Sequence, residues 1–579
     1  MQPLSTIDLL STELFQLHYK NTSRRERLEL SYLRARAIAK HWALTLDDVI
    51  RVSPKSQRAH MDGIIVRDPV AHINLSIQYN LVVGTLATYV KKRPDLDPLI
   101  REFLEFDICG AFMLNEVGHG CDARNLETTA TWESDGGFIL NTPNRNAAKF
   151  MPPSMPMAGI PRVALVMARL LVEGEDRGIR PFVVPINDGY RMCQGVKSWQ
   201  VTIDCLQAEL LSNLSRLLPP IGCGEMLDHS LTTFDHVRLE ASAMLGDLAK
   251  PGNLRAQFLF AIGQLRLGSL ALSLWTIPFL KCAAFTAGKY SQQRTVQEGV
   301  HRERVPILSF RTQQLPIARA LAHVAVMEPL VEWVVSQQNN SSLSVMSRHA
   351  LSAALKSLFV YNGQESLSAL VERSGAQGMF PENQMANVES LTRCTSIAEG
   401  ELLVLCIRHA TEILLERCEI PEAENPTSLL AKHESGIIAE LRELLKTFES
   451  HRSTEYNKFI LPRCRPVMLA IGQRMAFEIA AKRGVDGDLL AMYESEAVRS
   501  DPSWYMECLG LSRAAQYEME STACDAVMSK LNRHLNDLGI EPYCTAPMLS
   551  GAKWDDFINV ARTFTARADG RAAVFHPRL

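Results

Sequence analysis

The stretch that decides the fold is Phe112–Ser154, FMLNEVGHGCDARNLETTATWESDGGFILNTPNRNAAKFMPPS. In Gly118–Gly120 two glycines flank a histidine, which allows the backbone to turn sharply and to approach a flat ligand closely. Thr128–Trp132 then alternates between polar and apolar residues, as a half-buried strand does. Asp135–Gly137 is typical of a tight hairpin turn before a second strand at Phe138–Asn141. The stretch therefore predicts the edge of a small β domain.

Size and composition indicate a globular protein that acts on a small molecule. For 579 residues we expect about three or four domains. Apolar residues make up 46% and charged residues 22% of the chain, and the net charge of -3 gives no reason to expect a nucleic acid partner. The thirteen cysteines lack paired spacing, which favours a reducing compartment. Cys109, His119 and Cys121 do not have the spacing of a zinc site, so we predict no metal.

Three segments bear on cellular location. The amino end, MQPLSTIDLLSTELF, is acidic where an export signal is basic, so we expect no cleaved leader. The most apolar region, 258–285, is interrupted by polar residues and predicts a buried helix rather than a membrane span. We expect this first long helix of the carboxy-terminal half to begin at Gln257 and to kink or end at Pro278. Pro577–Leu579 has the form of a peroxisomal targeting signal; the alternative is a frayed tail of a cytoplasmic protein.

Changes in hydrophobic periodicity predict an α+β fold that is mostly α, in four domains. The amino-terminal part has helical spacing and the following part has strand spacing, after which helical spacing resumes. The middle part lacks a dinucleotide-binding fingerprint, and we find neither a nucleophile elbow nor a Walker A loop. The predicted domains are a helical domain at 1–108, a small sandwich-like or barrel-like β domain at 109–240, a helical bundle at 241–420, and a second helical domain at 421–579.

Two segments carry a resemblance to a known family. The loop Asn115–Gly120 and the segment Lys149–Met151 resemble the T-E-x-G-x-G loop and the K-W-W segment of the acyl-CoA dehydrogenase and acyl-CoA oxidase superfamily. In that superfamily both lie in the flavin-binding middle domain. The segment at 76–108 resembles the helical amino-terminal domain of acyl-CoA oxidases, so the resemblance begins before the flavin loop. A second helical domain after the bundle is also a feature of the oxidases.

Further motifs follow in the carboxy-terminal half. Tyr290–Gln297 and Pro306–Gln314 resemble the Tyr-Arg-Gln motif of the superfamily and the T-Q-Q of its oxidase branch. The resemblance implies that Arg294 reaches the pyrophosphate of a flavin held by the neighbouring subunit. An arginine suits this role because its planar fork binds two phosphate oxygens and stays charged. The alternative is a surface arginine at a polar helix end.

The implied catalytic residue is Glu399. Gly375–Gly378 stands where the family has G-G-x-G, and Glu399 follows Gly378 by 21 residues, where oxidases carry the catalytic glutamate of T-Y-E-G. The residues after Gly400 form the apolar face of a helix, so Glu399 is expected at a helix start among apolar neighbours. The alternative is a first-turn glutamate favoured by the helix dipole.

The resemblance implies a flavoenzyme that oxidises an acyl thioester. Removing hydrogen from Cα and Cβ needs a base and a hydride acceptor, and no side chain accepts a hydride. FAD, acyl-CoA, dioxygen and a homodimer are therefore implied, with peroxide as the second product. The implied cofactor contacts are Asn115, Gly118, Lys149, Phe150, Met151 and Ser154 from one subunit, and Arg294, Gln297, Gln314, Gly375, Gln377 and Gly378 from its partner.

Departures from the family pattern leave alternatives open. Asn115 replaces a threonine, and Phe150–Met151 replace two tryptophans. Ala376–Gln377 stand for Gly-His, and Ile397–Ala398 stand for Thr-Tyr or Thr-Phe before the glutamate. These changes indicate an unusual acyl group, as in specialised metabolism. One alternative is a dehydrogenase or desaturase with another electron acceptor, and a second is a flavin-free relative that serves as a binding or scaffold protein.

Overall fold

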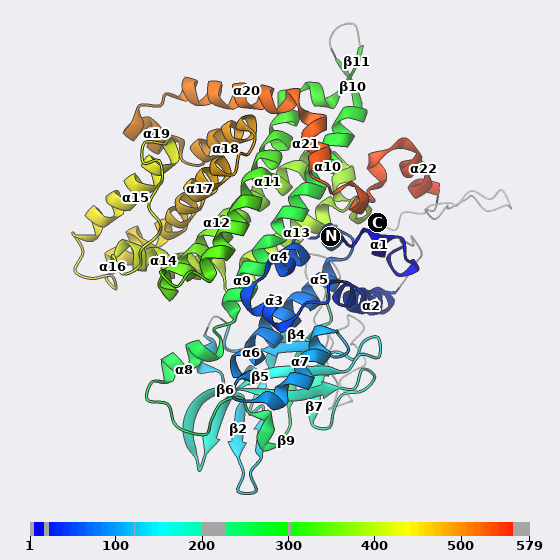
Figure 1. Cartoon of the computed structure of the whole chain (residues 1–579), viewed down its shortest axis with the longest axis vertical. Coiled ribbons are helices and arrows are strands. Elements are labelled where there is room, and N and C mark those ends of the chain that lie inside the picture. The colour runs from blue at the N-terminus through cyan, green and yellow to red at the C-terminus, as the bar shows by residue number, and fades with distance from the viewer. Residues whose placement is uncertain (1–4, 17–22, 121, 200–226, 299–302, 560–579) are drawn as a thin grey trace, which may run out of the picture.

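The protein has a large helical part above a β domain (Figure 1). The predicted α+β, mostly α fold class is confirmed. The elements change from helices to strands between Leu104 and Cys109, and back to helices between Leu239 and Leu254. The computed structural model describes the whole chain except residues 1–4, 17–22, 121, 200–226, 299–302 and 560–579.

Short helices with clear start signals build the amino-terminal part. A capping box of Ser23 and Glu26 begins α2, and one of Thr45 and Asp48 begins α3. Residues 69–90 are helical throughout, as α5, a π-helical segment and α6 in succession. The helices are α1 (Ile7–Leu10), α2 (Arg24–Trp42), α3 (Leu46–Arg51), α4 (Pro54–His60), α5 (Pro69–Ser76), the π-helical segment (Ile77–Val83), α6 (Gly84–Val90) and α7 (Asp97–Leu104).

The β domain consists of two sheets. The larger has the order β1-β5-β2-β3-β9, with β6 also paired to β5, and the smaller has the order β4-β8-β7. The predicted hairpin is confirmed, because β2 and β3 pair in antiparallel register with Thr129 opposite Asn141. The strands are β1 (Cys109–Met113), β2 (Thr129–Trp132), β3 (Phe138–Asn141), β4 (Lys149–Pro153), β5 (Arg162–Val172), β6 (Glu175–Asn187), β7 (Val196–Trp199), β8 (His229–Phe234) and β9 (Val237–Leu239).

The carboxy-terminal half is helical apart from one hairpin at the top of Figure 1. Its core is formed by α10, α11, α12 and α17, which pack on one another. The elements are α8 (Leu254–Ala261), α9 (Leu265–Leu274), α10 (Thr276–Gln293), β10 (Thr295–Glu298), β11 (Glu303–Pro306), α11 (Arg311–Gln338), α12 (Val345–Arg373), α13 (Met385–Ile397), α14 (Leu402–Leu414), α15 (Leu429–Leu445), α16 (Thr454–Phe459), α17 (Cys464–Lys482), α18 (Gly487–Ser500), α19 (Pro502–Leu509), α20 (Arg513–Ser529), α21 (Leu531–Asp537) and α22 (Gly551–Asn559).

The helix expected from Gln257 is divided into α8, α9 and α10, with breaks at 262–264 and at Trp275. The break at 262–264 was not predicted. The break at Trp275 agrees with the expected kink at Pro278, because Pro278 is the third residue of α10 and has no N–H to bond the Leu274 carbonyl four residues earlier. Among the described residues, Leu254–Gln293 is apolar and long enough to cross a membrane, but 94% of its most apolar window is buried inside the protein.

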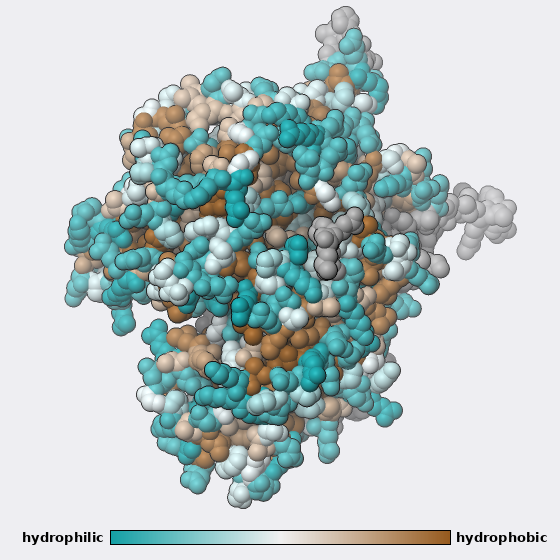
Figure 2. All heavy atoms as spheres, viewed as in Figure 1, coloured by the Kyte–Doolittle hydropathy of each residue, from teal (hydrophilic) through white to brown (hydrophobic). Residues whose placement is uncertain are grey.

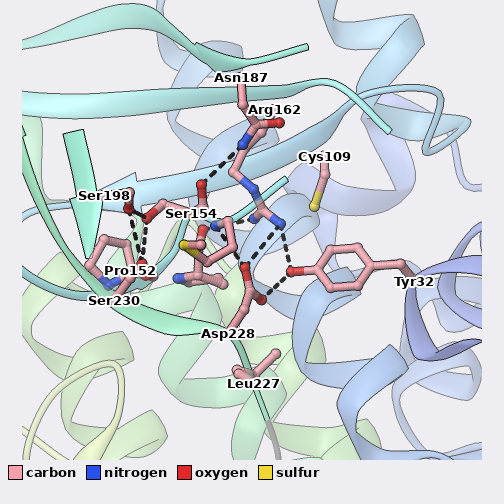
Figure 3. Close-up of polar contacts among 12 residues, drawn as sticks. Tyr32, Cys109, Pro152, Ser154, Arg162, Asn187, Ser198, Leu227, Asp228 and Ser230 are labelled. Atoms are coloured by element: carbon pink, nitrogen blue, oxygen red, sulfur yellow. Dashed lines mark hydrogen bonds and ion pairs between the residues drawn. The ribbon is translucent and has the colours of Figure 1, made fainter. Parts of the chain in front are cut away.

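A buried arginine joins the β domain to the amino-terminal helices (Figure 3). The guanidinium of Arg162 on β5 donates to the Pro153 carbonyl at 2.8 Å and to the Tyr32 hydroxyl on α2 at 2.6 Å. Tyr32 donates in turn to the Asp228 carboxylate at 2.5 Å. Burial raises the pKa of Tyr32 well above its usual range, so the phenol stays protonated and can donate. Together, Arg162 and Asp228 form a charged network that fixes α2 against the β domain.

We predict that Arg162→Met destabilises the protein by about 3–5 kcal/mol, because it leaves the buried Asp228 carboxylate without its countercharge. Urea unfolding followed by circular dichroism measures the loss. The control is Arg238→Met in the same domain, whose ion pair with Asp135 is exposed and should contribute less than about 1 kcal/mol. Equal losses in the two variants would contradict this account.

Candidate active site

Glu399 lies on a turn between α13 and α14. Its backbone is in the left-handed region with φ of 54°, and the next residue, Gly400, has φ of 101°. The carboxylate that caps α14 is that of Glu401, which accepts from the backbone N–H groups of Leu403 and Val404. Glu399 is therefore not the first-turn glutamate of the alternative interpretation, because a neighbour has that position.

The carboxylate of Glu399 is buried and has no hydrogen-bond partner among the described residues. The residue as a whole is half-buried, but its Oε2 atom is shielded from solvent and unpaired. It lies against α9 at Gly268, where an added Cβ would be 1.4 Å from Oε2. Only glycine leaves room for the carboxylate at this position. A buried, unpaired acceptor is costly, and such groups need a structural or functional explanation.

Electrostatics give this carboxylate a high proton affinity. Burial raises the pKa of Glu399 to about 8, and the charge of Lys356 on α12 opposes the shift. The Lys356 ammonium is fully buried and donates to the carbonyl oxygens of Ala398 at 2.9 Å and Gly400 at 2.7 Å. A carboxylate whose pKa lies near the working pH is suited to accept a proton in a reaction.

The π-helical segment Ile77–Val83 connects this turn with the β domain. Leu81 of the segment lies beside the same position of Gly268 that Glu399 contacts. On the side of the β domain, Gln78 accepts a hydrogen bond from the Gly110 backbone N–H of β1 at 2.7 Å. Because β1 leads directly into the loop that carries Asn115, the segment contacts both the glutamate side and the strand before the predicted flavin loop. Such π-helical turns are frequent at functional sites.

Four of the predicted cofactor residues in the β domain lie together near its surface. Asn115 and Phe150 are exposed, and the Phe150 N–H donates to the Asn115 carbonyl at 2.9 Å. Gly118 is exposed and donates to the Asn146 carbonyl at 2.9 Å, while Met151 is half-buried with φ of 53°. The loop and β4 therefore present amide, backbone and apolar groups side by side.

The side chains of the other two predicted residues in this set, Lys149 and Ser154, are buried inside the domain. The Lys149 ammonium donates to the Glu116 carboxylate at 2.9 Å and to the Met167 carbonyl at 2.7 Å. The Ser154 hydroxyl lies in a cluster with those of Ser198, Ser230 and Thr232 (Figure 3). The structure does not bring these two side chains to the surface formed by the others. Their contact with a cofactor stays a prediction.

The predicted contacts of the partner subunit gather at one end of the helical bundle. Gln313 ties this end together, because its amide donates to Ser291 of α10 at 2.8 Å and to the Arg373 carbonyl of α12 at 3.3 Å. Arg294 follows α10 and is exposed, with no ion pair among the described residues. The Gly375 backbone has φ of 63°, and no atom would contact a Cβ there.

Some of the remaining residues of this set form hydrogen bonds with nearby parts of their own chain. Gln297 on β10 is exposed, whereas Gln314 donates to the Leu308 carbonyl at 3.0 Å. The Gln377 carbonyl accepts from Asn383 at 2.8 Å, and Gly378 is buried. The hairpin of this set is at the top of Figure 1 and the β domain is at the bottom. The hairpin that carries Gln297 and the β domain that carries Asn115 therefore lie apart along the long axis of the structure.

Sequence reasoning missed three residues of the site. Gly268 and Lys356 surround Glu399 but belong to helices with no motif, so no sequence signal marks them. Glu116 is buried, pairs with Lys149 and accepts from the backbone N–H groups of Glu127 and Thr128. Glu116 could have been found from the sequence, because it matches the glutamate of the T-E-x-G-x-G loop. The pairing indicates that this glutamate supports the loop from inside.

The surface near the turn of Glu399 is partly apolar. Ile397 is 69% exposed and Val404 is 54% exposed, on either side of Glu399. The molecular surface is also indented between the upper helical part and the β domain, at the left of Figure 2. A separate hollow of about 850 Å³ lies between α2, α3 and α7, and none of the predicted site residues lines it.

We predict that Glu399→Gln makes the stability of the protein less sensitive to pH. Folded Glu399 keeps its proton up to about pH 8, whereas in the unfolded chain it loses it near 4.5, so wild-type stability falls as pH rises through this window. The glutamine is neutral at every pH, so position 399 of the variant makes no pH-dependent contribution to stability. The difference in melting temperature between the variant and the wild type should grow from about pH 5 to about pH 7. A constant difference would show that Glu399 has an ordinary pKa.

Comparison by sequence identifies related proteins of known type. No family model matches the chain. Acyl-coenzyme A oxidase 2, peroxisomal, of Arabidopsis thaliana is 25% identical over 383 residues, and peroxisomal acyl-coenzyme A oxidase 3 of Homo sapiens is 25% identical over 406 residues. The matches cover 62% and 65% of this chain and 53% and 55% of those proteins. The chain thus spans about half the length of the curated relatives it matches.

Comparison by structure finds the same fold in solved acyl-CoA oxidases. Acyl-CoA oxidase 1 from Yarrowia lipolytica has a TM-score of 0.77 at 16% identity, over 95% of this chain and 88% of that one. Acyl-CoA oxidase-2 of Caenorhabditis elegans, bound with FAD, ascaroside-CoA and ATP, has a TM-score of 0.75 at 16% identity, over 96% and 88% of the two chains. At such identities the likeness shows the fold. In sequence and in fold, the predicted resemblance of this protein to the acyl-CoA oxidase family is confirmed.

Proposed function

We propose that this protein is an FAD-dependent acyl-CoA oxidase that converts an acyl thioester into its trans-2-enoyl thioester. The observation that carries the proposal is the buried and unpaired carboxylate of Glu399, whose pKa is raised to about 8. A structural carboxylate at this depth would have hydrogen-bond donors around it. This one is unpaired and open to an external proton donor.

In the proposed reaction, Glu399 takes the proton from Cα of the thioester. The electron pair of that C–H bond forms the new Cα–Cβ double bond, while the hydrogen on Cβ leaves as a hydride. The raised pKa makes the glutamate a stronger base than an ordinary carboxylate, and its unpaired Oε2 needs no hydrogen bond to be broken first. The exposed side chains of Ile397 and Val404 offer apolar contact next to the base.

The residues of the β domain fit a flavin. Asn115 offers an amide, and Phe150 offers an apolar wall that is 40% exposed. The missing Cβ of Gly118 makes room for Asn146 of the same chain, so this glycine would support the loop. Exposed Arg294 has no competing carboxylate among the described residues and suits a pyrophosphate. FAD, when bound, supplies the hydride acceptor, and in an oxidase it passes the two electrons to dioxygen, which gives hydrogen peroxide.

The positions of the two residue sets support a homodimer. Asn115 is hydrogen-bonded to β4, and Arg294 directly precedes β10. These two strands lie far apart along the long axis of Figure 1, so in this proposal one flavin does not contact both residues within a single subunit. Two chains arranged head to tail would bring the bundle end of one against the β domain of the other, and twofold symmetry would form two such sites. FAD rather than FMN follows from this arrangement, because only the longer cofactor extends to the second subunit.

A dehydrogenase or desaturase of the same fold is the second candidate, since the turn of Glu399 serves either reaction. A panel of acyl-CoA thioesters with peroxide detection separates them: an oxidase forms peroxide in stoichiometry with enoyl-CoA, and a dehydrogenase needs another acceptor. A purified protein without a flavin spectrum would favour the scaffold alternative. The panel also tests for the unusual acyl group of a specialised pathway.

The peroxisomal names of relatives support a peroxisomal location, while Pro577–Leu579 lies outside the described residues.

We predict that Glu399→Gln slows flavin reduction by roughly 10²-fold or more while FAD and thioester still bind, because the variant keeps the size of the side chain but not the proton acceptor. Anaerobic stopped-flow mixing with an acyl-CoA measures the rate. The matched control is Glu401→Gln, which removes the charge of the neighbouring carboxylate but keeps an oxygen to cap α14, and should retain turnover within a few-fold. Wild-type bleaching of the flavin in the Glu399 variant would exclude it as the base.

We predict that Arg294→Ala weakens FAD binding and dimerisation together, because one guanidinium would serve the cofactor across the interface. Flavin content after gel filtration and the mass from light scattering report the two effects. The control is Arg304→Ala in the same hairpin, where the arginine donates to Thr295 of its own chain. If the Arg294 variant retains flavin as the control does, the motif has been assigned incorrectly.

A further inference from the structure

Lys356 is a buried cation whose hydrogen bonds do not go to a carboxylate. It lies near the middle of α12 and is fully buried. Its ammonium donates to the carbonyl oxygens of Ala398 and Gly400, which are the residues on either side of Glu399. Burying a lysine costs several kcal/mol, which must be offset by hydrogen bonds and opposite charge. Neither carbonyl belongs to a motif that requires a cation, so the lysine needs an explanation of its own.

The turn that Lys356 contacts has an unfavourable backbone. Residues other than glycine rarely adopt the left-handed conformation of Glu399, because their Cβ comes too close to the following carbonyl oxygen. The Ala398 carbonyl belongs to the peptide unit just before Glu399, and the Gly400 carbonyl belongs to the unit just after Gly400. One ammonium thus fixes both peptide units around the two left-handed residues. Without it, the turn would be free to relax to an ordinary conformation.

The conformation of the turn determines where the carboxylate points. Glu399 extends to Gly268 on α9, a position that admits its Oε2 only because a Cβ is missing. A small rotation of the turn would move the carboxylate out of this place. No side chain holds the carboxylate itself, since Oε2 has no partner among the described residues. Its orientation therefore depends on the backbone of the turn.

We propose that Lys356 is a positioning residue that restrains the turn 398–400 through these two carbonyls and so holds the Glu399 carboxylate beside Gly268. The inference rests on the proposed role of Glu399 as the base. Lys356 bonds the backbone of the turn and not the carboxylate, which stays free to accept a proton. An ion pair with the same lysine would instead occupy the oxygen that has to react.

The charge of Lys356 is a separate effect that the test has to distinguish from its hydrogen bonds. Burial lowers the pKa of Lys356 to about 8, and the carboxylates of Glu399 and Glu401 and the Cys406 thiol on α14 oppose this shift. The lysine of the wild type therefore loses its charge within the pH range of the assay, and its effect on the pKa of Glu399 is read below about pH 8. Glu399 in turn is stabilised in its charged form by Lys356 against the effect of burial. Removing the charge should therefore raise the apparent pKa of the base, whereas removing the hydrogen bonds should lower the rate at every pH.

Two variants separate the effects. Lys356→Met removes both charge and donors, and Lys356→Gln removes the charge but keeps an N–H donor. Flavin reduction by the best acyl-CoA of the panel is followed anaerobically from about pH 6 to about pH 10, and hydrogen exchange of the amides at 399–401 is measured without substrate. The control is Lys281→Met in the same bundle, whose lysine pairs with Glu328 and should affect neither measurement.

We expect Lys356→Met to lower the limiting rate roughly 10- to 100-fold, to raise the apparent pKa and to speed exchange in the turn. Lys356→Gln should recover most of the limiting rate and of the protection while the raised pKa remains. The proposal is overturned if the methionine variant keeps the wild-type limiting rate, or if the glutamine variant is as slow as the methionine variant. Should the methionine variant fail to fold, the glutamine variant decides alone, and a slow limiting rate or fast exchange in it overturns the proposal.

The experiments distinguish failure of the proposed function from failure of the inference about Lys356. If Glu399→Gln, measured in the same assay, reduces flavin at the wild-type rate, then Glu399 is not the base. Hydrogen exchange at 399–401 still reports whether Lys356 restrains the turn, because it needs neither substrate nor turnover. The effect of Lys356 on the backbone is thus tested independently of the reaction.

Discussion

A carboxylate buried without a hydrogen-bond donor is the constraint on which the arrangement of the site depends. Leaving a polar group unpaired in a protein interior costs free energy, and Glu399 meets that cost by a raised pKa, which keeps it neutral below about pH 8. Its position requires Gly268 on one side and the restraint of Lys356 on the other. Helices α9 and α12 and the turn that carries Glu399 thus together leave a single oxygen atom unpaired.

The relative placement of the parts depends on a second set of buried contacts. Arg162 ties the β domain to α2, and Gln78 in the π-helical segment ties β1 to the amino-terminal helices. Because the same segment reaches α9 through Leu81, the predicted flavin loop and the glutamate are held relative to each other by rigid elements. The proposed reaction needs a base that is positioned to within about 0.5 Å, and buried, rigid connecting segments would provide this precision.

Local patterns predicted the local structure well. The hairpin at 129–141 follows from alternation and a glycine turn, and both signals lie within a few residues of one another. The break at 262–264 in the helix expected from Gln257 was missed because hydrophobic periodicity cannot show a break that tertiary packing imposes, whereas the break at Trp275 follows from Pro278. Lys149 and Ser154 were assigned from their place in a motif, but burial of their side chains depends on strands far along the chain.

The sequence by itself determined the fold class, the flavin-loop resemblance and the position of Glu399, because each depends on residue types at short and fixed spacing. Only the tertiary structure decided that Gly268 makes room for the carboxylate and that Lys356 bonds both sides of its turn. Neither residue lies near Glu399 in the sequence, and neither belongs to a pattern. The burial of the Glu399 carboxylate and the hydrogen bonds of Lys356 arise only when α9 and α12 pack around the turn, and the raised pKa of Glu399 follows from that packing.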